Sequence, residues 1–147
     1  MVYYNNKTVK GRDIVMTKEE LMTYAQEALQ HAYCPYSNFP VGAAILYKDG
    51  TVIKGANIEN VSFGATSCAE RSALFAGASQ GYRKGDIVAI AVAGKTEDYL
   101  PPCNICRQAL VEFCSPETPV YLVNGDNDIL SLTLNDLVPY SFTKLDM

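Results

Sequence analysis

The segment IVAIAVA at residues 87–93 is an unbroken apolar run of strand length. A strand that is apolar on both faces is typical of a sheet that is covered by helices on both sides. The run is the longest apolar stretch of the chain, yet it is far shorter than the roughly 20 residues that a membrane-spanning helix needs. The sequence therefore predicts a buried central strand and no membrane segment.

Helix and strand patterns lie on both sides of this run. Thr17 and Glu20 form a capping box, and apolar residues follow at helical spacing, which predicts a helix from about 18 to 33. An Asp-Gly pair at residues 49–50, between two apolar runs, predicts a hairpin. The other expected elements are strands at 41–47, 51–58, 120–123 and 129–132 and helices near 68–80, 104–114 and 134–138.

This order of elements combines parallel crossovers with antiparallel hairpins. The predicted fold class is α/β: a three-layer α/β/α sandwich with one mixed sheet of about five strands. With 147 residues, of which 48% are hydrophobic, the chain is long enough for one domain core and too short for two. We expect a polar N-terminal arm over residues 1–16 and a single catalytic domain over residues 17–147.

The charge balance restricts the partners of the protein. Lys and Arg number 12 against 16 Asp and Glu, and no long basic run occurs that could neutralise phosphates. This favours a small-molecule substrate and argues against nucleic acid and membranes as partners. The first ten residues lack the apolar core of a secretory signal. Five cysteines without such a signal indicate a reducing compartment, so we expect a cytoplasmic protein.

Two short motifs, CAE at residues 68–70 and PCNIC at 102–106, carry the chemical information. A catalytic zinc ion takes three protein ligands and keeps a fourth position for water. The motifs match the zinc deaminase signature C-x-E…P-C-x-x-C. We therefore expect Cys68, Cys103 and Cys106 to bind Zn²⁺, and Glu70 to transfer protons without binding the metal.

The cysteines also fit other kinds of site. A lone C-x-x-C also fits a redox pair or half of a structural zinc site. A structural site would need a fourth ligand, such as His31 or another cysteine, and such sites usually pair two motifs where this chain has one. His31 is expected to be an ordinary helix residue, and Cys34 and Cys114 are expected to be buried free thiols.

Both cysteine motifs are predicted to begin helices that follow strands. Ligand sites in open α/β sheets gather outside the carboxyl ends of the strands, and helix N-termini stabilise thiolates. Three thiolates on Zn²⁺ leave a net negative charge, which calls for positive charge nearby. Arg71 and Arg107 directly follow the two motifs and are the candidates. The chemistry expected of such a site is hydrolytic removal of an exocyclic amino group.

The chain resembles cytidine deaminases of the small, homotetrameric type. The resemblance extends from about residue 17 to residue 142 and rests on four segments: YCPYSNFPVGAA (33–44), GANIEN (55–60), CAERSA (68–73) and PCNICRQ (102–108). It implies a zinc-dependent hydrolytic deamination of cytidine and deoxycytidine to uridine and deoxyuridine plus ammonia, in pyrimidine salvage. It also implies a homotetramer.

The resemblance further implies which residues bind the substrate. Asn57 and Glu59 occupy positions that bind the ribose 3′-hydroxyl in the family, and Phe39 would lie against the pyrimidine. The backbone N–H of Ala69 and the carboxylate of Glu70 would bind the polar edge of the ring.

Two further aromatic residues bear on the substrate site. Phe142 matches an aromatic residue that family members insert into the site of a neighbouring subunit. Phe63 departs from the family pattern, which usually has Tyr five residues before the first zinc cysteine. Its ring cannot donate a hydrogen bond to the 5′ end of a nucleoside, and the preference between cytidine and deoxycytidine stays open.

Three alternative functions remain at this point. One is deamination of a related aminopyrimidine, such as the antibiotic blasticidin S, although Asn57 and Glu59 favour a nucleoside. The second is a non-catalytic zinc-binding module. The third is a polynucleotide-editing deaminase, against which the acidic charge balance argues.

Overall fold

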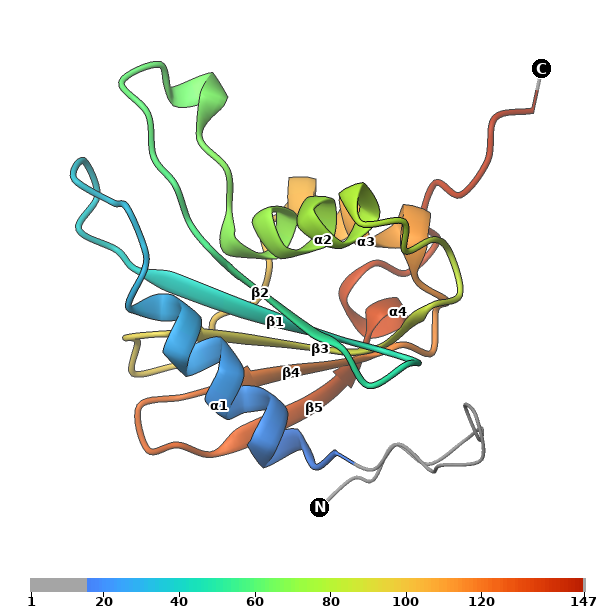
Figure 1. The fold of residues 1–147 in the computed structure, drawn as a ribbon, viewed down its shortest axis with the longest axis horizontal. Helices are drawn as coiled ribbons and strands as arrows, with labels where there is room; N and C mark the ends of the chain where they lie inside the picture. Colours follow the sequence, from blue (N-terminus) through green and yellow to red (C-terminus); the bar gives the residue numbers. More distant parts are fainter. Residues whose placement is uncertain (1–15, 147) are drawn as a thin grey trace.

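The computed structural model describes residues 16–146 (Figure 1). Residues 1–15 of the expected N-terminal arm lie outside the described residues. Met16, the last residue of that arm, is half-buried and packs against the core. The elements in chain order are α1 (Lys18–Leu29), β1 (Val41–Tyr47), β2 (Val52–Ala56), the 3₁₀ turn η1 (Phe63–Ala65), α2 (Ala69–Ser79), β3 (Ile87–Gly94), α3 (Asn104–Phe113), β4 (Pro119–Val123), β5 (Ile129–Thr133) and α4 (Leu134–Leu137).

The five strands form one mixed sheet in the order β2-β1-β3-β4-β5. Strands β3 and β4 are parallel, and the other three neighbouring pairs are antiparallel. Helix α1 covers one face of the sheet, and α2 and α3 cover the other (Figure 1). This confirms the predicted three-layer α/β/α fold. None of the helices described here is long and apolar enough to cross a membrane.

Strand β3 is the buried centre of the sheet, as its sequence predicts. The larger side chains Ile90 and Val92 belong to the core cluster beneath α2 and α3. The small side chains Ala89, Ala91 and Ala93 belong to the cluster beneath α1. Because the alanines occupy little volume, they let α1 approach this face of the sheet closely.

The predicted first helix is correct at its start and four residues too long at its end. Thr17 and Glu20 form both bonds of the capping box. The helix ends at Leu29, and the next residues form tight turns with i−3 hydrogen bonds. Tyr33 then exchanges backbone hydrogen bonds with the chain at Asn57 and Glu59, at 2.9 and 2.8 Å. Pairing with this distant segment ends the helix before Pro35 does.

The second strand is also shorter than predicted, because it ends at Ala56 and not at Ile58. Ile58 leaves the ladder with β1 and forms isolated bridges to Tyr33 and Ser67. The hairpin between β1 and β2 is confirmed, with Gly50 at a φ of 87° in its turn. The chain after β2 therefore runs beside the loops that contain Tyr33 and Ser67 instead of extending the sheet.

The backbone of α2 lies directly on β2 at Gly55. A Cβ atom at this position would lie 2.4 Å from the backbone N of Ala73 and 2.5 Å from the carbonyl oxygen of Ala69. Real Cβ contacts are essentially never below 3.0 Å, so any side chain here must displace the helix. Glycine at this strand position fixes how closely the first turn of α2 approaches the sheet.

We expect Gly55→Ala to destabilise the protein by about 1–3 kcal/mol, because overpacking against a helix backbone has this cost. The entropic gain of replacing Gly by Ala is only about 0.4–1 kcal/mol and does not offset it. The matched control is Gly64→Ala, since a Cβ at Gly64 meets nothing within 4 Å. Thermal unfolding of both variants measures the difference. Equal midpoints for Gly55→Ala and the parent protein would show that α2 can shift without cost.

Candidate metal centre and active site

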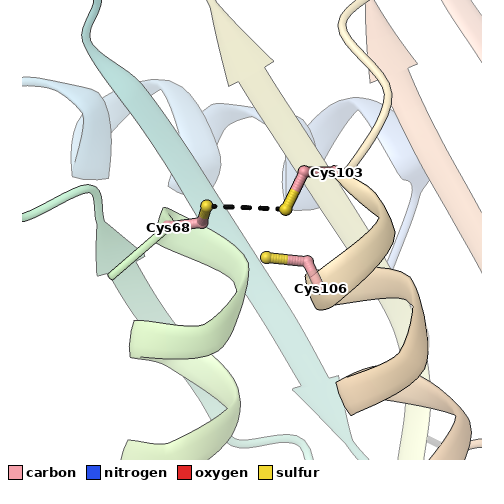
Figure 2. A group of neighbouring side chains, drawn as sticks. All are labelled: Cys68, Cys103 and Cys106. Atoms are coloured by element: carbon pink, nitrogen blue, oxygen red, sulfur yellow. Dashed lines mark hydrogen bonds between the residues drawn. The ribbon is translucent and has the colours of Figure 1, made fainter. Parts of the chain in front are cut away.

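Three cysteine side chains converge where α2 and α3 begin. Cys68 is the N-cap residue of α2, Cys103 is the N-cap residue of α3, and Cys106 lies in the first turn of α3. Their sulfur atoms all lie within 4.8 Å of one another and point toward a common centre (Figure 2). Within residues 16–146 this is the one group of three or more potential metal-binding side chains.

The spacing of the sulfur atoms fits a zinc ion. Zinc binds thiolate sulfur at about 2.3 Å in tetrahedral geometry, which places two sulfur ligands ~3.8 Å apart. The distance from Cys68 Sγ to Cys103 Sγ is 3.7 Å. The cluster consists of three sulfur donors and contains neither His31 nor Cys34 nor Cys114. Three protein ligands with one further coordination position are the arrangement of catalytic zinc sites.

The surroundings of Cys68 favour its thiolate. A hydrogen bond from the Cys106 thiol, together with the guanidinium of Arg71, lowers the pKa of Cys68 to about 5. Arg71 Nη2 lies 3.5 Å from Cys68 Sγ and 3.5 Å from the carbonyl oxygen of Thr66. The position of Cys68 at a helix N-terminus adds the partial positive charge of the helix dipole.

Glu70 lies directly beside the sulfur cluster and is only 4% exposed. Cys106 Sγ lies 3.8 Å from Glu70 Oε2, within hydrogen-bond reach of a sulfur atom. Burial raises the pKa of the Glu70 carboxyl above its usual value. The hydrogen bond to Cys68 and burial likewise raise the pKa of the Cys106 thiol. A buried carboxyl group with a raised pKa, next to a metal position, suits proton transfer.

The two candidate arginines have different partners. Arg71 contacts the sulfur of Cys68, whereas Arg107 donates its described hydrogen bonds to the carbonyl oxygens of Pro102 and Leu137, at 2.7 and 2.8 Å. The positive charge expected beside the thiolates therefore comes directly from Arg71. Arg107 instead contacts the backbone directly before Cys103 and at the end of α4.

A pocket of about 300 Å³ opens between the loop after α1 and the loop that carries η1. Glu59 Oε1 accepts hydrogen bonds from the backbone N–H groups of Tyr36 and Ser37, at 2.9 and 3.1 Å. Hydrogen bonds from Ser37 and Tyr36 lower the pKa of Glu59, so the group is an anion at neutral pH. The residues that line the pocket are Tyr36, Ser37, Glu59, Phe63 and Thr66.

Asn57 is buried, with 9% exposure, and its amide joins two backbone groups. Its Oδ1 accepts from the N–H of Val41 at 2.9 Å, and its Nδ2 donates to the carbonyl oxygen of Phe39 at 2.8 Å. Asn57 therefore fixes the backbone that presents Phe39, whose ring is 43% exposed. The sequence alone did not indicate this role, because the partners lie 16 to 18 residues away.

The remaining predicted site residues differ in burial, since Ala69 is buried and the two phenylalanines are exposed. Ala69 is fully buried in the first turn of α2, between Cys68 and Glu70. Phe63 is 76% exposed and makes an edge contact with the ring of Tyr36. Phe142 is 64% exposed in the C-terminal segment, where its carbonyl oxygen accepts from Gln108 at 2.9 Å.

The residues outside the cluster agree in part with expectation. Cys114 is a buried free thiol, and burial raises its pKa to about 12. Cys34 is free but only half-buried. His31 is exposed in the turn after α1. Tyr36, Ser37 and Thr66 were not predicted as site residues, since their contacts to Glu59 and Arg71 join loops that the sequence does not pair.

Comparison with known proteins agrees with this geometry. Residues 15–122 match the family model described as the cytidine and deoxycytidylate deaminase zinc-binding region. The cytidine deaminase of Halalkalibacterium halodurans is 52% identical over 90% of this chain and 98% of its own length. That of Sporosarcina psychrophila is 46% identical, over 90% and 96%. The crystal structure of a cytidine deaminase from Burkholderia pseudomallei superposes with a TM-score of 0.84 at 45% identity, covering 86% of this chain and 100% of that chain.

We expect the purified protein to contain about one zinc ion per chain, because three thiolates and a fourth position complete a tetrahedral site. Alanine at Cys68, Cys103 or Cys106 should abolish tight zinc retention. Cys34→Ala is the matched control, because Cys34 is a free thiol outside the cluster. Metal analysis after gel filtration measures the stoichiometry. Full zinc content in all three cluster variants would exclude these residues as the ligands.

Proposed function

The chain belongs to the cytidine and deoxycytidylate deaminase family, and we propose from this that it hydrolyses cytidine and deoxycytidine to uridine and deoxyuridine plus ammonia. One observation carries the proposal: a buried carboxyl group, Glu70, lies beside a cluster of three sulfur ligands at the start of two helices. We assign the activity to a single catalytic domain over residues 17–147 and the reaction to pyrimidine salvage.

Cys68, Cys103 and Cys106 would hold the zinc ion, and Arg71 would offset part of the negative charge of the three thiolates. When bound, zinc supplies a Lewis acid that makes a water molecule nucleophilic near neutral pH. Zinc ligands must be deprotonated, so Cys106 would hold the metal as a thiolate.

Glu70 would move the protons of the reaction at its Oε2 atom. It takes a proton from the attacking water and gives one to the ring nitrogen beside the reacting carbon. It then transfers the second water proton to the departing amine. The C–N bond breaks, and the products are a uracil ring and ammonia. Burial supports this assignment because it keeps the pKa of Glu70 closer to the working pH than that of an exposed carboxyl group.

The loops around the pocket would bind the nucleoside. The carboxylate of Glu59 has about four acceptor sites, so its backbone hydrogen bonds leave capacity for a ribose hydroxyl. Asn57 would contribute through the second N–H of its Nδ2 atom. It would also fix the position of Phe39, which would lie against the pyrimidine. The N–H of Ala69 would bind the polar edge of the ring, and Phe63 would contact the 5′ end by its ring alone.

We also propose that the protein is a homotetramer in the cytoplasm. The rings of Phe39, Phe63 and Phe142 are all more than two-fifths exposed in the single chain. Exposed aromatic residues of this kind are typical of interfaces, so a neighbouring subunit would cover them and complete the pocket. All five cysteines are free thiols, which supports a reducing compartment.

A panel of cytidine, deoxycytidine, free cytosine, CMP and blasticidin S, with release of ammonia as the readout, tests the proposed substrate. We expect rapid turnover of the two nucleosides. We expect slower turnover of free cytosine, because it lacks the ribose that Glu59 would bind. We also expect slower turnover of CMP, because its phosphate would approach a pocket whose lining residues include the carboxylate of Glu59 and no basic side chain. Turnover of blasticidin S without turnover of either nucleoside would contradict the proposal.

Glu70→Gln should retain the fold and the zinc ion but lose at least about 10²–10⁴-fold in kcat, because an amide cannot carry the proton. Glu112→Gln on the exposed side of α3 is the matched control and should keep full activity. Steady-state kinetics and metal analysis on the same preparations separate loss of chemistry from loss of metal. A kcat near that of the parent protein would remove Glu70 from the mechanism.

For the assembly, light scattering should give about four times the chain mass of 16.1 kDa, since a closed symmetric oligomer is a common state for a domain of this size. Deletion of residues 140–147 removes Phe142 and should impair catalysis while zinc content and secondary structure persist. A fully active monomer at the assay concentration would contradict the shared-site assembly.

A further inference from the structure

Arg107 joins two segments that are distant in the sequence. Its side chain is half-buried in the first turn of α3. Nε donates to the carbonyl oxygen of Pro102 at 2.7 Å, and Nη1 donates to the carbonyl oxygen of Leu137 at 2.8 Å. A planar guanidinium group holds its N–H donors in a fixed fork, so both bonds constrain one rigid group.

The first of these carbonyls belongs to the segment that carries two of the cysteines. Pro102 is fully buried and directly precedes Cys103. Cys103 is exposed, and the described contact of its side chain is with Cys68 Sγ at 3.7 Å. The peptide before it is therefore held by the burial of Pro102 and by the hydrogen bond from Arg107. These two contacts fix the direction in which Cys103 leaves the loop.

The second carbonyl belongs to the end of α4. The last carbonyls of a helix lack partners within the helix, and cations are favourable there. Leu137 is the last residue of α4, and the C-terminal segment, residues 138–146, begins directly after it. The next residue of α3 adds a bond to the same segment, from Gln108 Nε2 to the carbonyl oxygen of Phe142 at 2.9 Å. The segment runs beside α3 and then away from the sheet (Figure 1).

We propose that Arg107 is a positioning residue that couples the C-terminal segment to the turn that carries Cys103 and Cys106. The inference rests on the proposed metal site. Loss of the fork frees the carbonyl of Pro102 and the end of α4 together. Zinc then dissociates faster from its ligands, and the C-terminal segment detaches from α3 more often. Contacts beyond the ligands typically change metal affinity about 10–100-fold.

The alternative role for Arg107 is electrostatic compensation of the thiolates. The two roles differ in whether a lysine at position 107 can perform them. Arg107→Lys keeps the charge but loses the fork, so lysine restores an electrostatic role and fails in a positioning role. Arg83→Lys is the matched control, because Arg83 Nη1 also donates to two backbone carbonyls, those of Ala78 and Tyr82, outside the metal cluster.

The experiment uses the zinc-loaded full chain and two measurements. One is the rate of zinc transfer to an excess of a chromogenic chelator. The other is amide hydrogen exchange of residues 138–146, where the N–H of Val138 is bonded to the carbonyl oxygen of Leu134. We expect Arg107→Lys to accelerate zinc transfer about 10-fold or more and to accelerate exchange in the segment. Arg83→Lys should change neither rate.

A zinc transfer rate in Arg107→Lys equal to that of the parent protein overturns the proposal, as does faster transfer with unchanged exchange at the C-terminal segment. If Arg107→Lys does not fold, Gln108→Ala serves in its place and should accelerate exchange in the segment together with a smaller acceleration of zinc transfer. Unchanged rates in that variant also overturn the coupling. Failure of the proposed function is distinguishable, because the parent protein would then hold no zinc or release no ammonia.

Discussion

The direct contact between the first turn of α2 and strand β2 is the constraint on which the site depends. Gly55 lets the backbone at Ala69 and Ala73 lie against the strand, so the start of α2 has one allowed distance from the sheet. Cys68, Ala69 and Glu70 all belong to this turn. The sheet thereby places one metal ligand and the carboxyl group beside the first turn of α3, which carries the other two sulfur atoms.

The sequence predicted what short-range patterns determine. The capping box at Thr17, the Asp-Gly turn at Asp49 and the apolar run at 87–93 depend on neighbours within a few residues, and the structure contains all three. The cysteine cluster was predictable for a related reason: ligand type and spacing restrict a zinc site strongly.

Long-range pairing is what the sequence could not supply. The helix ends at Leu29 because Tyr33 pairs with a segment more than 20 residues later, and that pairing overrides the helical pattern. The amide of Asn57 and the guanidinium of Arg107 likewise bond to backbone groups that lie far along the chain or across a loop. The sequence identified Asn57 and Arg107 as site residues. It could not identify the backbone groups to which they bond, because these partners depend on the tertiary fold.

Arg71 and Arg107 follow the two cysteine motifs at equivalent places, yet the structure divides two tasks between them. A thiolate cluster needs positive charge, which Arg71 supplies at 3.5 Å from Cys68 Sγ. The ligands of such a cluster must also be held in a fixed direction, and Cys103 is an exposed side chain that the protein interior does not enclose. Arg107 meets this second need through the peptide before Cys103, and its other bond holds Leu137, the residue from which the segment with Phe142 starts. The neighbouring Gln108 bonds to Phe142 itself. If that segment enters a neighbouring subunit, as we propose, Arg107 couples the turn that carries Cys103 and Cys106 in one chain to the substrate pocket of the next chain.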